Sequence, residues 1–323
     1  MQAPTTLQQA VLYFSDPKRC NDFMIGVRWA DGKVRCPYCD SINVTYLESV
    51  NRWKCYGKHA KAQFSLKVGT IFEDSPLGLD KWLVAVWLIV NCKNGISSTE
   101  IARDLGITQK SAWHMAHRVR LAMQAGHFGK LAGEVEVDET YIGGKARNMS
   151  ISKRKRLNLT RGRSMAGKVA VMGLLERHPE KGKSRVVTTV IDGRKKHHMQ
   201  PTVRERVEAG TTVNTDAHFS YQGLSDDYAH CVIDHAEAYV DGTIHTNGLE
   251  NYWSLLKRAL KGTYVSVEPF HLFRYLDEQA FRFNNRRELT DLDRFTLAVS
   301  QVVGKRLTYA EVTGKTRLPE SIH

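Results

Sequence analysis

The stretch His245-Thr-Asn-Gly-Leu-Glu-Asn-Tyr-Trp-Ser-Leu-Leu-Lys-Arg258 is the part of the chain from which the rest is interpreted. It predicts a helix that opens at Asn247, because Asn is a good N-cap and a glutamate three residues later fits a capping box. Apolar residues recur along this stretch with helical spacing, so one face of the helix should pack on a core. These residues are Leu249, Trp253, Leu256 and Leu260.

A neighbouring face of the same helix carries Glu250, Ser254 and Lys257. A carboxylate and a lysine two turns apart at the rim of a core are suited to chemistry. The alternative is that Glu250 only caps the helix and that Lys257 is a solvated charge. The upstream sequence bears on this choice.

The segment 134–144, Glu-Val-Glu-Val-Asp-Glu-Thr-Tyr-Ile-Gly-Gly, alternates as a strand does. Glu136 and Asp138 should lie on one face of that strand, with Val135 and Val137 on the opposite face. Further strands are predicted at 168–176, 184–192, 212–216 and 230–235, with a helix over 199–210. Three strands, a helix, two strands and a helix predict an α/β fold with a mixed five-stranded sheet flanked by helices.

The charge of the chain points to a polyanionic partner. The chain has 323 residues, and 47 Lys and Arg against 34 Asp and Glu give a net charge of +13. Such a balance favours nucleic acid over other partners. An apolar run long enough to span a membrane, a signal-peptide pattern and a basic amphipathic helix are all missing, and the six cysteines do not form a disulfide framework. We expect a cytoplasmic protein in a reducing compartment, with no membrane partner.

A zinc ribbon is predicted near the N-terminus. Cys36-Pro-Tyr-Cys39 forms a Cys-x2-Cys knuckle, and Cys55 with His59 follows after fifteen residues, enough for a β-hairpin. A short Cys-x2-Cys spacing lets both thiolates bind one ion. We expect one structural Zn2+ held by these four side chains, with His59 as the fourth ligand. The alternative is a set of core thiols without a ligand.

The segment 96–120 predicts a helix–turn–helix. The first helix should run from Ser98 to Leu105, with Gly106 in the turn and Thr108 capping the second helix. A recognition helix at this position would contact the major groove of DNA. The side chains expected to bind DNA are Gln109, Lys110, Ser111, His114 and Arg118. A plain helical hairpin is the alternative.

A basic segment follows the first predicted strand. Residues 145–168 carry nine Lys and Arg and no Asp or Glu, which predicts a mobile loop suited to phosphates. Its expected DNA-binding residues are Lys153, Arg154, Lys155 and Arg156. The alternative is a solvated surface loop.

The expected domain boundaries follow these segments. Residues 1–75 should form an N-terminal helical segment with the zinc ribbon, and 76–130 the helix–turn–helix region. Residues 131–290 should form the α/β domain, and 291–323 a C-terminal tail.

Three carboxylates are placed to meet in the α/β domain. Asp138 lies in the first strand, Asp216 ends the fourth, and Glu250 lies in the first turn of the last helix. Neighbouring strands can bring such groups together, and phosphodiester chemistry uses oxygen ligands that bind two Mg2+ ions. A cluster of carboxylates without metal would repel itself, so stability alone does not explain it.

The chain resembles bacterial insertion-sequence transposases with a zinc ribbon, a helix–turn–helix and a DDE catalytic domain of the ribonuclease H-like, integrase type. The resemblance covers nearly the whole chain. Besides the knuckle and the segments 135–144 and 245–258, it rests on Phe64-Ser, Gly69-Thr-Ile-Phe-Glu-Asp-Ser75, Thr215-Asp216, Arg274-Tyr-Leu-Asp-Glu and Phe281-Arg-Phe-Asn-Asn-Arg286.

The resemblance implies that Asp138, Asp216 and Glu250 are the metal-binding triad and that Lys257 contacts the DNA end. The implied cofactors are two Mg2+ or Mn2+ ions. The implied activity is binding of terminal inverted repeats, strand cleavage at each end and transfer to target DNA, by an oligomer that holds both ends. Two alternatives are a transposase-derived DNA-binding regulator without nuclease activity, and a ribonuclease H-type nuclease acting on RNA or RNA–DNA hybrids.

Overall fold

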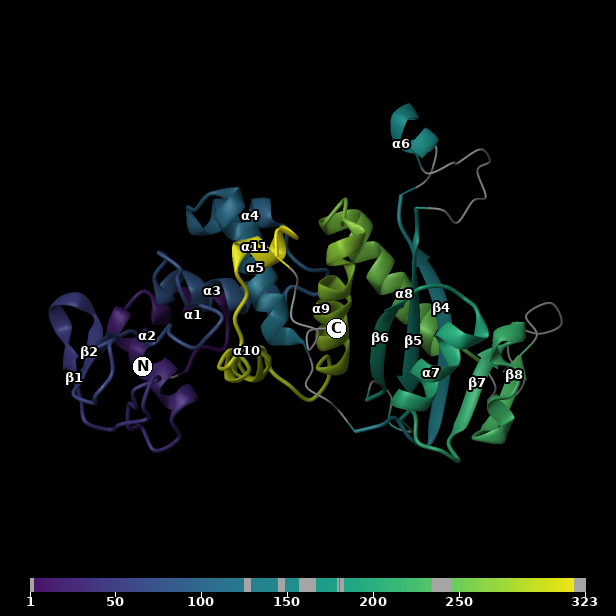
Figure 1. The fold of residues 1–323 in the computed structure, drawn as a ribbon, viewed down its shortest axis with the longest axis horizontal. Helices are drawn as coiled ribbons and strands as arrows, with labels where there is room; N and C mark the ends of the chain where they lie inside the picture. The colour runs from purple at the N-terminus through teal and green to yellow at the C-terminus, as the bar shows by residue number, and fades with distance from the viewer. Residues whose placement is uncertain are drawn as a thin grey trace. The chain divides into compact units, whose positions relative to one another are not determined.

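The chain packs as two compact units, Met1–Gln124 with Glu288–His323, and Ala125–Arg287. The computed structural model describes residues 3–124, 129–144, 149–156, 167–178, 180, 183–233 and 245–316 (Figure 1). The expected segments 1–75 and 76–130 thus fall largely in one unit, which also takes up the expected C-terminal tail. No described helix has the length and apolar character needed to cross a bilayer.

The core of the first unit is built by helices from both ends of the chain. Phe295 is fully buried, and its ring lies 5.5 Å from that of Phe14 and 5.2 Å from that of Trp87. The apolar run 82–90 is buried along its whole length, which makes it a core helix. The helices here are α1 (Leu7–Phe14), α2 (Pro17–Arg28), α3 (Leu79–Asn91), α10 (Asp291–Ser300) and α11 (Tyr309–Val312).

A small antiparallel sheet carries the cysteines. Its strands are β1 (Val44–Leu47), β2 (Arg52–Cys55) and β3 (Gln63–Phe64), in the order β1-β2-β3. The hairpin turns at Asn51, which adopts the left-handed conformation with φ 49°. The predicted hairpin between the two ligand pairs is therefore confirmed.

The two helices α4 (Ser98–Leu105) and α5 (Gln109–Met123) begin where the sequence predicts. Ser97 and Glu100 form a capping box at the start of α4, and Thr108 accepts from the Ser111 amide at the start of α5. Gly106 ends α4 with φ 59°, a conformation that glycine adopts without steric cost.

The second unit contains a mixed five-stranded sheet in the order β6-β5-β4-β7-β8. β4 pairs antiparallel with β5 and parallel with β7, and β7 pairs parallel with β8. This confirms the predicted fold class. The strands are β4 (Glu134–Ile142), β5 (Val169–Glu176), β6 (Arg185–Ile191), β7 (Thr212–Asp216) and β8 (Ala229–Ile233). Positions 234 and 235 of the last predicted strand lie outside the described residues.

Helices cover both faces of this sheet (Figure 1). On one face Val135 and Val137 pack with α7 (Lys196–Arg206). On the other, Val171 and Leu175 of β5 pack with α8 (Asn247–Arg258) and α9 (Leu272–Asn284). The apolar residues of α8 are buried as predicted, and a π-helical turn, Ala259–Thr263, follows them.

Three local expectations are wrong. The helix predicted over 199–210 is α7, which runs from Lys196 to Arg206 and contains a proline, Pro201. Residues 151–156 form a short helix, α6 (Ile151–Arg156), in place of the predicted loop. The N-cap of α8 is Thr246 and not Asn247, and the Thr246 side chain makes no capping hydrogen bond.

Candidate active site and zinc-binding site

The four predicted zinc ligands converge. The donor atoms of Cys36, Cys39, Cys55 and His59 all lie within 4.8 Å of one another. Cys36 Sγ is 3.3 Å from His59 Nε2, and Cys39 Sγ is 3.6 Å from Cys55 Sγ. Ligands of tetrahedral Zn2+ at about 2.3 Å from the ion stand ~3.8 Å apart, so this set fits one structural ion.

Gly57 lies in the loop between Cys55 and His59 of the candidate zinc site. Its backbone N–H donates to Cys55 Sγ at 3.2 Å, a bond that stabilises a thiolate. A Cβ at this position would lie 2.8 Å from Cys39 Sγ, so the loop can pass the ligands only with glycine here.

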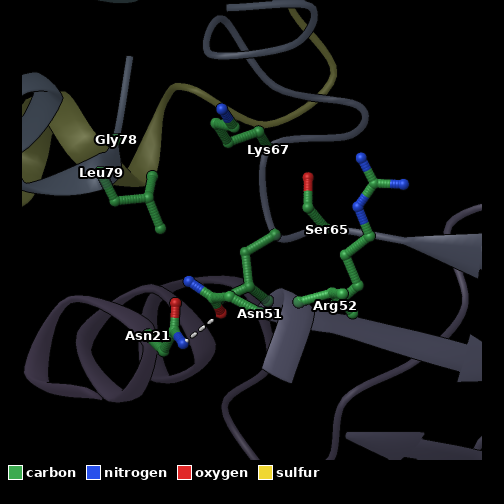
Figure 2. Close-up of a pocket in the computed structure, with 9 residues that line it drawn as sticks. Asn21, Asn51, Arg52, Ser65, Lys67, Gly78 and Leu79 are labelled. Atoms are coloured by element: carbon green, nitrogen blue, oxygen red, sulfur yellow. Dashed lines mark hydrogen bonds between the residues drawn. The ribbon is translucent and has the colours of Figure 1, made fainter. Parts of the chain in front are cut away.

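A polar pocket of about 250 Å³ adjoins the small sheet (Figure 2). Asn21 donates to Asn51 Oδ1 at 2.7 Å on its wall. The Lys67 ammonium donates to the carbonyls of Ser75 and Leu77, at 2.5 and 3.1 Å. Because that lysine already holds the loop before α3, we assign this pocket a structural role.

The two faces of β4 separate its acidic residues. Asp138 faces α8, whereas Glu139 points to the opposite side, where Tyr221 Oη donates to it at 2.7 Å and Arg194 pairs with it. The expected alternation of Glu136 and Asp138 against Val135 and Val137 is confirmed by the burial of the two valines in the core that α7 covers.

Asp138 is held by the indole of α8. Trp253 Nε1 donates to Asp138 Oδ2 at 2.8 Å. Gly173 of β5 pairs with Asp138, and a Cβ there would lie 2.6 Å from the Trp253 ring. Glycine in the neighbouring strand therefore lets the indole reach the carboxylate.

The pKa of Asp138 is affected by the other two carboxylates. Burial raises the pKa of Asp138 above its ordinary value, and the charges of Asp216 and Glu250 raise it further, against the hydrogen bond from Trp253. Negative groups interact in this way only when they are close. The parallel pairing of β4 with β7 ends at Glu136 with Asn214, and Asp138 and Asp216 each lie two residues beyond that last pair on their strands.

Glu250 and Lys257 line one pocket with Asp138. This pocket has a volume of about 430 Å³, and Trp253 and Ser254 also line it. Glu250 is exposed in the first turn of α8, and no side-chain capping bond involves it. Burial lowers the pKa of Lys257, while attraction to Asp138 opposes that shift.

The three carboxylates do not form a cluster whose donor atoms all lie within 4.8 Å of one another. In the described part of the chain, the zinc ligands are the one set of three or more donor side chains whose atoms all lie within 4.8 Å. Carboxylates that repel one another are expected to stand apart, and two ions about 4 Å apart do not require every donor to touch every other. The donor chemistry, oxygen only, fits Mg2+ or Mn2+.

Arg194 lies beside Asp216. Its Nη2 is 3.6 Å from Asp216 Oδ2, while the same group pairs with Glu139. The backbone N–H of His218 donates to Asp216 Oδ1 at 3.1 Å. The residues predicted from the sequence do not include Arg194. Its position in a basic run shortly after a predicted strand could have identified it as a residue near the site.

Glu136, which lies on the same face of β4 as Asp138, binds the start of α8 and Arg177. The Leu249 N–H donates to Glu136 Oε2 at 2.8 Å, and Arg177 Nε donates to Oε1 at 2.7 Å. Arg177 also donates to the His245 carbonyl at 2.5 Å. This network fixes the start of α8 from the sheet, and it leaves Glu250 free of the capping role that was its alternative.

The residues expected to read DNA divide into two groups. Gln109 and Lys110 are exposed at the start of α5, and Ser111 and His114 are partly exposed. Arg118 is buried, and its guanidinium donates to the carbonyls of Leu307 and Glu73, each at 2.8 Å. The expectation that Arg118 contacts DNA does not fit this packing, because its donors already serve the core.

The basic segment is described only in part. Arg154 is partly exposed and Lys155 exposed on α6. The side chains of Lys153 and Arg156, together with residues 145–148 and 157–166, lie outside the described residues.

Comparisons with known proteins show similarity to transposases. The model of the ISXO2-like transposase domain matches residues 130–284, which hold all three carboxylates and Lys257. An uncharacterized transposase-like protein of Haemophilus influenzae is 31% identical over 104 residues, 32% of this chain and 84% of that protein. An uncharacterized protein in transposable element ISH50 of Halobacterium salinarum is 28% identical over 260 residues, 76% of this chain and 84% of that protein.

Proposed function

Because the chain belongs to the insertion-sequence transposases and its residues 130–284 match the ISXO2-like transposase domain, we propose that it binds the terminal inverted repeats of its element and catalyses metal-dependent strand cleavage and strand transfer. The observation that carries the proposal is the pocket that Asp138, Glu250 and Lys257 line, with Asp216 near enough to raise the pKa of Asp138. Carboxylates that share a pocket with a lysine suit phosphodiester chemistry.

In cleavage, a water oxygen attacks the phosphorus at the element end and the bond to the 3′ oxygen breaks. The products are a 3′-hydroxyl on the element and a 5′-phosphate on the flank. In transfer, that 3′-hydroxyl attacks a phosphorus of target DNA, and a target 3′-hydroxyl leaves. Bound divalent ions would activate the attacking oxygen and stabilise the leaving oxygen.

The residues of the chain have distinct parts in this reaction. Asp138, Asp216 and Glu250 would hold the ions. Trp253 orients Asp138 through its indole hydrogen bond, and Lys257 would hold a phosphate of the DNA end in the same pocket. Burial lowers the pKa of Lys257, and a bound phosphate would favour the charged ammonium again.

DNA recognition would come from the zinc ribbon and the α4–α5 pair. The side chains of Gln109, Lys110, Ser111 and His114, which lie at the start of the second helix, would contact the major groove. Arg154 and Lys155 of α6 would contact phosphates. Two ends must be joined in one complex, so we expect an oligomer on DNA.

The test is Glu250→Gln in the full chain. With duplex DNA carrying the element's terminal repeat, Mg2+-dependent cleavage should fall at least ~100-fold while binding stays within about twofold. Glu208→Gln, an exposed glutamate of the same unit outside the pocket, is the control and should cleave normally.

Three outcomes speak against the proposal. If Glu250→Gln still cleaves the repeat DNA, Glu250 is not a metal ligand needed for catalysis. A wild-type protein that binds the repeat and never cleaves it favours the DNA-binding regulator. Preference for an RNA–DNA hybrid over the repeat duplex favours the ribonuclease H-type nuclease.

A further inference from the structure

The turn between β6 and α7, together with the first residues of α7, carries an unbroken basic run, Arg194-Lys195-Lys196-His197-His198, that the proposed function does not use. We propose that this turn binds the DNA backbone beside the candidate active site, at phosphates next to the one that is cut. The inference rests on the proposed function and adds a DNA contact from the α7 side of the sheet.

The topology puts this turn at the catalytic edge. β6 is antiparallel to β5, and β5 is antiparallel to β4, so β6 runs in the same direction as β4. β7 is parallel to β4 and ends at Asp216. The carboxyl ends of β6 and β7 therefore lie at the same edge of the sheet, and the basic run begins three residues after β6.

Arg194 ties the turn to the site. Its guanidinium pairs with the buried carboxylate of Glu139 and lies 3.6 Å from Asp216 Oδ2. The Ser220 hydroxyl donates to the Arg194 carbonyl, which fixes the backbone of the turn as well. Lys195 and Lys196, the next two residues, are thus held close to a carboxylate of the proposed reaction.

The lysines are available to a ligand. Lys195, Lys196 and His197 are exposed, and in the described part of the chain no carboxylate forms an ion pair with either lysine. The first turn of α7 contains no acidic residue. Asp192 is the acidic neighbour in the turn, and it lies 3.9 Å from His198 Nδ1.

Charge explains why DNA needs such a contact here. Asp138, Asp216 and Glu250 repel a phosphate backbone that approaches their edge of the sheet. Lys257 offers a positive charge from α8, on one face of the sheet, and Lys195 and Lys196 offer two from the α7 side. A strand that crosses this edge would meet cations on both sides of the carboxylates, which holds the scissile phosphate between them.

The test compares the full chain with Lys195→Ala/Lys196→Ala on duplex DNA that carries the element's terminal repeat and its flank. Arg206→Ala is the control, because it removes a cation from the other end of the same helix, where Arg206 pairs with Glu205 at 3.1 Å. In the double variant, the slope of log K against log salt should become shallower by about 0.9 for each phosphate that the protein no longer neutralises. Cleavage at about 0.15 M salt should fall on the order of tenfold, with an unchanged melting temperature and a control like wild type.

Substitution of single phosphates by uncharged methylphosphonates locates the contact. Wild type should lose affinity at one or two positions next to the scissile phosphate, and the double variant should not respond there. A double variant with the wild-type salt slope and the wild-type methylphosphonate pattern overturns this inference and leaves the proposed function standing. Failure of the proposed function is distinct, because wild type itself would then cleave no DNA.

Discussion

The carboxylate of Glu136, in β4, accepts a hydrogen bond from the backbone N–H of Leu249, 2.8 Å away and 113 residues later in the chain. A helix end leaves N–H groups without intrahelical partners, and one of these is satisfied here from the sheet. Gly248 permits the approach, since a Cβ there would lie 2.9 Å from both Glu136 oxygens. The strand that carries Asp138 thereby sets the position of the helix that carries Glu250.

Glu136→Gln tests this support. The amide retains an acceptor for Leu249 but removes the charge that pairs with Arg177, so the unfolding free energy should fall by about 2–4 kcal/mol. Cleavage should fall with it, because α8 loses its anchor. Thermal unfolding and cleavage of repeat DNA measure the two effects. Glu180→Gln removes an exposed pair with Lys183 and should cost under ~1 kcal/mol. Equal melting temperatures for the two variants would show that the network does not stabilise α8.

Gly173→Ala tests the packing of α8 on β5. The new methyl group would lie 2.6 Å from Trp253 Cζ2 and 2.8 Å from Leu249 Cδ2, so α8 must shift. We expect a loss of about 1–3 kcal/mol in unfolding free energy and weaker cleavage, since the indole would no longer reach Asp138. Gly262→Ala, with no atom within 4 Å of the new Cβ, is the matched control. A Gly173→Ala protein as stable and active as that control would contradict the close approach.

Asp138→Asn should make the metal-free protein more stable while it abolishes cleavage. Burial and two neighbouring carboxylates raise the pKa of Asp138 in the folded state, so the folded protein binds the proton more tightly than the unfolded chain does. The ionised carboxylate therefore costs stability above its folded pKa, and that cost disappears as the pH falls through the folded pKa and below the unfolded one. Asparagine still accepts from Trp253 and carries no charge. The melting temperature without divalent ions should rise at about pH 7 by about 2–4 °C, for a gain on the order of 1 kcal/mol.

The pH dependence checks that sign. The gain in melting temperature from Asp138→Asn should shrink as the pH is lowered, because the wild-type carboxyl becomes neutral too. A gain that grows at low pH, or a loss of stability at neutral pH, would mean that Asp138 is stabilised in its charged form.

His59→Ala tests the zinc site. The wild-type chain should bind one Zn2+, measured by atomic absorption, and the variant should lose it with a lower melting temperature of the first unit. Cys231→Ser removes a thiol outside the site and should keep one ion per chain. One full equivalent of tightly held zinc in His59→Ala would rule out His59 as a ligand.

Lys110→Ala and Arg118→Ala separate recognition from packing on α5. Lys110 is exposed, so its replacement should weaken repeat binding with little change in stability. Removal of the buried Arg118 leaves the Leu307 and Glu73 carbonyls without their donor and should cost about 2–4 kcal/mol. The opposite pattern, a stable Arg118→Ala protein that fails to bind DNA, would restore Arg118 to the DNA surface.

Local sequence patterns predict the strands of the five-stranded sheet, the helices α4, α5 and α8, and the candidate zinc ligands. Alternation in 134–142, helical spacing in 249–260, the predicted helix 98–105 and the capping signal at Thr108 each correspond to an element of the structure. The Cys36-x2-Cys39 knuckle, a motif of four residues, likewise indicates a metal site. Such features are readable because hydrophobic periodicity, caps and short chelates depend on neighbours in the chain.

The roles of the individual acidic and basic side chains depend on tertiary packing. Glu136 and Asp138 share a face of β4 and look alike in sequence, yet one caps α8 and the other meets Trp253. Arg118 is buried and donates to the Leu307 carbonyl. Arg194 pairs with Glu139 and lies near Asp216 because the strand order brings their segments together. These pairings join residues far apart in the chain, and sheet register and helix packing, which no local pattern encodes, bring them together.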